Sequence, residues 1–282
     1  MHERTEKMNG VNVIQNDIFH NCRQKFYPNG FVKTTVASRN IYKESGWEEC
    51  KKESIDIAKV PKPQSANPVS RNDSIIRAKK KVFDIAAMNG FAYFVTLTLD
   101  PKKIDRYSVT DVKRKLLNWL KNLVTRCGLK YLLIPERHKD GAIHLHGLFS
   151  GGITLSDSGT VKAPSFSKPV RITTALEHGI PIEECMKIYN LPQWTLGHSM
   201  AYATYGDITN CAKYITKYIT KDIDKIFGNF YYAGGDIVRD VPSKLSDVDY
   251  ESFECDSEYY CEQISTSFKY TEEKGDTADE IQ

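Results

Sequence analysis

The chain has 282 residues, of which 40% are hydrophobic and 27% are charged, and its formal net charge is +3. This length and composition allow a sizeable core in one large domain or two small ones. No apolar run is long enough to span a bilayer, and the N-terminal residues lack the apolar core of a secretory signal. We therefore expect a soluble protein of the cytoplasm.

Charge is distributed unevenly along the chain. Residues 240–282 contain 13 Asp and Glu but 3 Lys, which leaves a net charge of +13 on residues 1–239. A basic body of this kind suits a polyanion partner, although both charge runs can also be solvated surface. The seven cysteines form no CxxC pair, which argues against a disulfide framework and against a structural zinc site.

The first predicted element follows a long polar segment. Residues 1–70 are irregular and end in a linker rich in Pro and Ser at 59–70. A helix is predicted from Asp73 to Asn89, because apolar residues recur at helical spacing and Asn89-Gly90 ends the pattern. The basic side chains on this helix are candidate contacts to a polyanion: Arg77, Lys79, Lys80 and Lys81.

The middle of the chain predicts a strand, a helix and two more strands. Aromatic and β-branched residues over 91–101 predict a buried strand. Leucines at helical spacing predict an amphipathic helix over 111–128, which ends at Gly128. Residues 130–136 and 142–150 predict two strands joined by a tight turn.

The remaining chain is less regular. We expect strands within 167–174 and 193–205, a helix over 207–223 and then an acidic, disordered tail. These elements predict an α+β fold, in which flanking helices back a central antiparallel sheet of about five strands. The expected division is an irregular N-terminal region with its linker, a folded domain and the tail: residues 1–70, 71–239 and 240–282.

The stretch AIHLHGLF at 142–149 places two histidines on one face of a strand. Successive strand side chains alternate between faces, so His144 and His146 project together. A three-residue turn at 139–141, with Gly141 in the left-handed region, pairs Glu136 with His144 and brings this carboxylate beside both histidines. A two-residue turn would shift the register by one residue and turn Glu136 to the other face.

Two imidazoles and one carboxylate can form a metal site with open positions for substrate. Such a set suits Mn²⁺ or Mg²⁺ acting on a phosphate. His138 is a rival third ligand, although it lies nearer the turn than Glu136. The alternative is a half-exposed histidine pair that packs or forms hydrogen bonds without metal.

The segment KYITKYITK places two tyrosines on one side of a helix. Tyr214, Lys217, Tyr218 and Lys221 share a narrow stripe, separate from the apolar residues of the same helix. Tyrosine can act as a covalent nucleophile, and a neighbouring ammonium group favours the phenolate. The alternative is an exposed basic face on which the tyrosines pack at their edges.

The strand FVTLTLD at 94–100 adds a third candidate feature. Thr96 and Thr98 share a strand face, where they can position the site or bind a phosphate by hydrogen bonds. An ordinary core strand explains the same pattern equally well.

Together these segments resemble the HUH-endonuclease superfamily, and in particular the rolling-circle replication initiators of phage and plasmid type. The resemblance consists of a TLT-like strand at 94–100, the His-Leu-His motif at 144–146 and the YxxKYxxK motif at 214–221, in the family's order. It covers residues 74–223, and it implies a ferredoxin-like βαββαβ fold with the histidines on a central strand.

The resemblance also implies a reaction. Mn²⁺ or Mg²⁺, held by His144, His146 and Glu136, would polarise a phosphate of single-stranded origin DNA. One tyrosine would attack to form a 5′-phosphotyrosine link and a 3′-hydroxyl, the second would take part in rejoining, and Lys217 and Lys221 would neutralise charge. The basic helix residues, Thr96 and Thr98 would contact the DNA, and Tyr107 and Tyr205 are candidates for stacking on its bases. No GxxxxGK[ST] motif is present, so we expect a separate helicase and polymerase from a bacterial host, in its cytoplasm.

Other functions remain open at this point. The basic helices and aromatics also suit a non-catalytic nucleic-acid-binding module with merely structural histidines. Within the superfamily, a relaxase places its tyrosine before the histidine strand, and a transposase of this kind uses a single tyrosine. The order and the doubled tyrosine in this chain favour the initiator over both.

Overall fold

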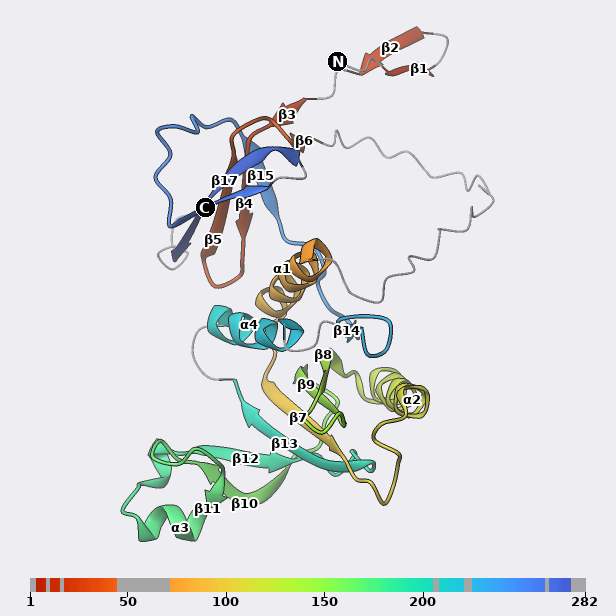
Figure 1. The fold of residues 1–282 in the computed structure, drawn as a ribbon, viewed down its shortest axis with the longest axis vertical. Coiled ribbons are helices and arrows are strands. Elements are labelled where there is room, and N and C mark those ends of the chain that lie inside the picture. Colours follow the sequence, from red (N-terminus) through yellow and green to blue (C-terminus); the bar gives the residue numbers. More distant parts are fainter. Residues whose placement is uncertain are drawn as a thin grey trace. The chain divides into compact units, whose positions relative to one another are not determined.

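The computed structural model describes residues 4–8, 11–15, 18–44, 72–204, 208–220, 225–261 and 264–274. They belong to two compact units, each described here by itself (Figure 1). The first unit combines the two ends of the chain, Met1–Gln64 and Val241–Gln282. The second unit is the continuous segment Ser65–Asp240.

The first unit is built on a five-stranded antiparallel sheet of order β15-β4-β5-β17-β16. Its strands are β4 (Cys22–Phe26), β5 (Phe31–Ala37), β15 (Ser243–Ser246), β16 (Ser257–Cys261) and β17 (Thr266–Lys274). The unit also contains two short antiparallel pairs: β1 (Arg4–Met8) with β2 (Val11–Gln15), and β3 (Phe19–His20) with β6 (Tyr42–Lys43).

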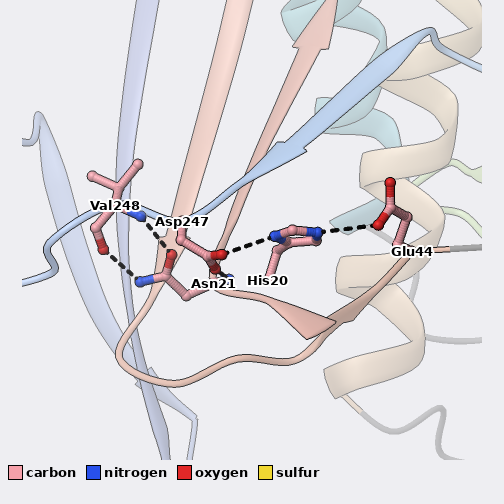
Figure 2. Close-up of polar contacts among 5 residues, drawn as sticks. All are labelled: His20, Asn21, Glu44, Asp247 and Val248. Carbon is pink, nitrogen blue, oxygen red and sulfur yellow. Dashed lines mark hydrogen bonds and ion pairs between the residues drawn. The ribbon is translucent and has the colours of Figure 1, made fainter. Parts of the chain in front are cut away.

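Side chains also tie the two chain ends of this unit together (Figure 2). The buried Asn21 amide donates to the carbonyl of Val248 at 2.7 Å and accepts from its N–H at 2.9 Å. His20 lies between two carboxylates, with Nδ1 3.1 Å from Asp247 and Nε2 3.6 Å from Glu44.

This arrangement differs from the irregular region and the disordered tail predicted for residues 1–70 and 240–282. The described parts of both segments contain strands of one sheet. The sequence did not reveal them because each strand finds its partner at the opposite end of the chain, and local alternation carries no information about such pairing.

The second unit contains a sheet of eight strands, whereas about five were predicted. Their order is β11-β10-β12-β13-β7-β9-β8-β14, and every neighbouring pair is antiparallel. The bounds are β7 (Tyr93–Leu99), β8 (Lys130–Arg137), β9 (Ile143–Ser150), β10 (Ser156–Lys162), β11 (Val170–Arg171), β12 (Met186–Asn190), β13 (Gly197–Ala203) and β14 (Tyr232–Gly234). The α+β class is as predicted.

The additional strands come largely from an insertion between β9 and β13. We call residues 156–190 the arm; it contains β10, β11, α3 (Ile172–Glu177), the 3-10 helix η1 (Ile182–Glu184) and β12 (Figure 1). Within 167–174, only two residues form a strand, because the chain then turns into α3. The arm occupies the place where the βαββαβ plan expects a helix, and α4 (Ile208–Thr216) follows β13 instead.

One face of the sheet is covered by α2 (Val109–Cys127). Its N-cap Ser108 accepts a hydrogen bond from the N–H of Asp111, and Gly128 ends it in the left-handed conformation, as predicted. Leu116 and Leu120 are fully buried in one core with β-strand residues such as Leu97. Each such leucine contributes about 1.5–3 kcal/mol relative to an exposed position.

The opposite face carries α1 (Asn72–Asn89) and α4, which lie side by side (Figure 1). The Asn89 side chain donates to the carbonyl of Ile85 at 2.7 Å and, with Gly90 in the left-handed region, ends α1 where predicted. Beyond Thr216 the chain tightens into the 3-10 helix η2 (Lys217–Thr220), so only part of the helix predicted over 207–223 is an α-helix. In the described part of the chain, no helix is both long and apolar enough to cross a bilayer.

Candidate active site

The hairpin of β8 and β9 determines where the two histidines lie. Gly141 adopts φ of +83°, the N–H of Gly141 donates to the carbonyl of His138 at 2.8 Å, and the N–H of His138 donates to Ala142 at 2.9 Å. This is the predicted three-residue turn, and it places Glu136 opposite His144 in the register. The sequence-based register is therefore confirmed.

Strand β7 supplies the other neighbours of the histidines. Thr96 lies opposite His146 and Thr98 lies opposite His144. The Thr98 hydroxyl is 2.6 Å from Nε2 of His144, and the Thr96 hydroxyl is 3.3 Å from Nδ1 of His146. Each threonine therefore forms a hydrogen bond to one ring nitrogen and orients the other nitrogen of that ring.

The two remaining ring nitrogens meet each other and a carboxylate. Nδ1 of His144 lies 3.3 Å from Nε2 of His146, which is also 3.0 Å from Oε2 of Glu136. His146 and Glu136 are each 8% exposed. Burial, followed by the charge of nearby His138, lowers the pKa of His144 to about 4, so its imidazole is neutral at neutral pH.

The chemistry of these donors fits a divalent metal, because neutral imidazole nitrogens and a carboxylate oxygen are ligands of Mn²⁺. As placed, the three side chains bond to one another, and no group of three His, Cys, Asp or Glu residues in the described part of the chain is arranged as a ligand shell. His138, the rival ligand, is exposed at the turn, and its ring centroid lies 4.4 Å from that of His144.

The two tyrosines lie directly over the histidines. The ring of Tyr218 stacks on that of His146, with centroids 3.9 Å apart and planes 19° apart. Its hydroxyl donates to the hydroxyl of Tyr214 at 3.0 Å. Tyr214 packs edge-on against Phe94, with ring centroids 5.3 Å apart.

The environments of the two phenols differ. Tyr214 is 44% exposed but Tyr218 is 8% exposed, although the helical pattern placed both off the core face. Burial, and then the hydrogen bond to Tyr214, raise the pKa of Tyr218 strongly, so this phenol stays protonated. Nζ of Lys217 lies 5.7 Å from the ring centroid of Tyr214. Lys221 lies outside the described residues, as does Tyr205.

These groups open into one cavity of about 790 Å³. Its lining combines the histidines, Glu136 and Thr96 with the tyrosines and with basic side chains from two directions. The lining residues are Phe94, Thr96, Glu136, Arg137, His138, Lys139, His144, His146, Lys162, Ser167, Pro169, Ile188, Met200, Tyr202, Tyr214 and Tyr218. Acid, base, nucleophile and cation thus share one space that is large enough for a nucleotide segment.

The basic residues predicted on α1 do not line this cavity: Arg77, Lys79, Lys80 and Lys81. Lys81 instead forms an ion pair with Asp240, with Nζ 3.1 Å from the carboxylate. Tyr107 is exposed beside Arg106, whose guanidinium donates to its hydroxyl at 3.0 Å, and it also lies outside the cavity lining.

Several lining residues were not predicted. Phe94 shares strand parity with Thr96 and Thr98, so alternation along β7 could have identified it. Tyr202 stacks on Phe94 at 5.2 Å because β13 pairs with β7, and this pairing has no local signal. Lys162 belongs to the arm, whose fold the sequence did not indicate.

Comparison with known proteins gives one match. Residues 92–223, slightly under half of the chain, match a family model described as Replication-associated protein, of the ORF2 type. Neither the curated proteins nor the solved structures contain a match. The matched segment includes the histidine strand, both tyrosines and the arm, and it supports a role as a replication initiator.

Proposed function

We propose that this protein is a rolling-circle replication initiator that nicks and rejoins single-stranded origin DNA through a 5′-phosphotyrosine intermediate. The observation that carries the proposal is the position of Tyr218 between the hydroxyl of Tyr214, at 3.0 Å, and the ring of His146, at 3.9 Å between centroids. A pair of phenols joined to a His-His-Glu cluster in one cavity is the equipment of phosphoryl transfer to tyrosine.

Tyr214 is the better placed nucleophile for the first cleavage. Its hydroxyl accepts the proton of Tyr218, which leaves its own proton free to depart as its oxygen bonds to phosphorus. The bond from phosphorus to the 3′-oxygen breaks, and the leaving oxygen takes a proton to become a 3′-hydroxyl. Lys217, close to the Tyr214 ring, lies where a cation can neutralise charge on the phosphoryl oxygens.

The metal is part of this proposal. His144, His146 and Glu136 would hold Mn²⁺ or Mg²⁺, which supplies Lewis-acid polarisation of the scissile phosphate when bound. Thr96 and Thr98 orient the imidazole rings through their hydroxyls, at 3.3 Å and 2.6 Å. They therefore act on the histidines, whereas the sequence analysis placed them among the residues that contact DNA.

Rejoining uses the second phenol. Once Tyr214 carries the 5′-phosphate, Tyr218 is the neighbouring nucleophile for a second strand, four residues away and on the same side of the cavity. Each transfer exchanges one phosphoester for another, so joining requires no nucleotide triphosphate. Strand separation and synthesis would fall to a helicase and a polymerase of the host.

A non-catalytic nucleic-acid-binding module is the competing function, since the cavity is basic and aromatic. The test incubates the protein and Mn²⁺ with labelled single-stranded oligonucleotides tiled across the replicon that encodes it. We expect a labelled protein band on a denaturing gel. The double variant Y214F/Y218F should give no such band while it still binds DNA, and Y107F, outside the cavity, serves as the matched control. Binding without any covalent product from the unaltered protein would support the module instead.

A further inference from the structure

The arm forms one wall of the cavity that contains the tyrosines. Tyr189 pairs with Ala201, so the neighbouring Ile188 shares a sheet face with Tyr202 and, through β7, with Phe94. Ile188 lines the cavity, as do Ser167 and Pro169 from the chain between β10 and β11. The sheet surface therefore runs without a break from the histidines to the arm.

Lys162 brings a cation to this wall. It ends β10 opposite Met186, on the face that Thr160 and Ile188 share, and its side chain lines the cavity while remaining exposed. Its neighbour Val161 points to the other face and is fully buried in the small core of the arm. In the described part of the chain, no carboxylate forms an ion pair with Lys162.

A second basic group faces the cavity from the opposite side. Arg137, His138 and Lys139 reach it from the β8–β9 turn, and the tyrosines and histidines lie between this turn and the arm. Glu136 is the single carboxylate of the lining, beside His146. A polyanionic strand that crosses the cavity would thus meet cations at both ends of its path.

We propose that the arm clamps the substrate strand, with Lys162 binding a backbone phosphate on one side of the scissile phosphate and Lys139 a phosphate on the other. The ligand is single-stranded DNA, so the inference rests on the proposed function for its substrate class, although phosphate binding by Lys162 can be measured without cleavage. Lys162 is a positioning residue, because it acts on the strand and not on the reacting bond.

The test measures binding of fluorescent single-stranded oligothymidylate over a range of KCl concentrations. K162Q should weaken binding several-fold at low salt and reduce the slope of log K against log salt by about 0.7, the value for one phosphate contact on a single strand. K162R should restore both quantities. The control is K187Q, which removes an equally exposed lysine of the same arm, on the face that Val161 shares.

Equal behaviour of K162Q and K187Q, whether both match the unaltered protein or both lose affinity, would overturn the clamp. A second readout separates this inference from the proposed function. At saturating origin DNA, K162Q should form the covalent product at the unaltered rate, with a raised half-saturation concentration. Absence of the covalent product from the unaltered protein would refute the nicking function, while the salt slopes would still decide the role of Lys162.

Discussion

The ring of Tyr218 lies flat on the imidazole of His146, with planes 19° apart, while Tyr214 keeps nearly half of its side chain exposed. Two residues that look equivalent in the repeated YITK sequence therefore have different surroundings. The buried phenol is fixed by stacking and by its hydrogen bond, and the exposed one faces the cavity. This asymmetry leads to a distinct expectation for each tyrosine.

Y214F should abolish the first cleavage, and Y218F should retain it. The reason is that Tyr214 is accessible, whereas burial holds Tyr218 in the protonated form. The measurement is covalent product on an oligonucleotide with one cleavage site, followed by transfer to a second labelled strand. Y218F should form the first product and fail in the transfer. A first product formed by Y214F at the unaltered rate would contradict this order.

Loss of the Thr98 hydroxyl should weaken metal binding by about 10- to 100-fold, the usual effect of removing a group that orients a ligand. T98V leaves Nε2 of His144 without the partner that lies at 2.6 Å, so the ring can rotate away from His146 and Glu136. Calorimetric titration with Mn²⁺ measures the affinity directly. T110V, at an exposed position of α2, is the control. Equal affinity in the two variants would show that Thr98 does not orient the ligand.

The depressed pKa of His144 predicts that stability falls in mild acid. The folded protein holds this group at a pKa of about 4, whereas the unfolded chain has about 6.5, so the unfolded chain binds more protons between these values. The free energy of unfolding should therefore decrease as pH falls from 6.5 to 4 and change no further on this account below 4.

Chemical unfolding of the metal-free protein over this pH range measures the effect, and H144Q is the reference, since it lacks the titrating group. The difference between the two curves should appear between pH 6.5 and 4. A difference that does not vary with pH would show that His144 titrates normally in the folded protein.

A good part of the site followed from local patterns. Strand alternation brought His144 and His146 to one face, and the Lys139-Asp140-Gly141 turn set the register that adds Glu136. These features depend on a few adjacent residues, so the sequence contains them. The helical spacing likewise brought Tyr214 and Tyr218 together, and they remain in contact although η2 replaces the last α-helical turn.

The features that were not predicted all depend on distant pairing. Burial of Tyr218 requires the ring of His146 on a different strand. Lys162 reaches the cavity because β10 joins β12, and β12 joins β13, at the edge of the sheet. The strands of residues 243–274 depend on partners near the beginning of the chain. Side-chain periodicity reports which face a residue occupies, and not which strand lies beside it.

Gly147 separates the histidine strand from its neighbour, and G147A should destabilise the protein by about 1–3 kcal/mol, as overpacking of a core does. An added Cβ would lie 2.8 Å from Cδ1 of Leu133 and 2.9 Å from the carbonyl oxygen of Leu132. Because His146 is the preceding residue, the forced shift should also lower the yield of covalent product. Thermal unfolding and the gel assay measure the two effects, and an unchanged melting temperature would contradict the close packing.

Asn21 offers a test of the other unit. Its side chain makes both an acceptor and a donor contact with the backbone of Val248, at 2.9 Å and 2.7 Å, and it is 8% exposed. N21A leaves a buried N–H and a carbonyl without these partners, so the free energy of unfolding should fall by about 1–3 kcal/mol. E44Q is the matched control, because the ion pair of Glu44 with His20 spans 3.6 Å at an exposed position and should contribute close to nothing. Denaturant unfolding followed by the signal of the first unit distinguishes the two variants, and equal stability of N21A and E44Q would mean that Asn21 does not hold the two chain ends together.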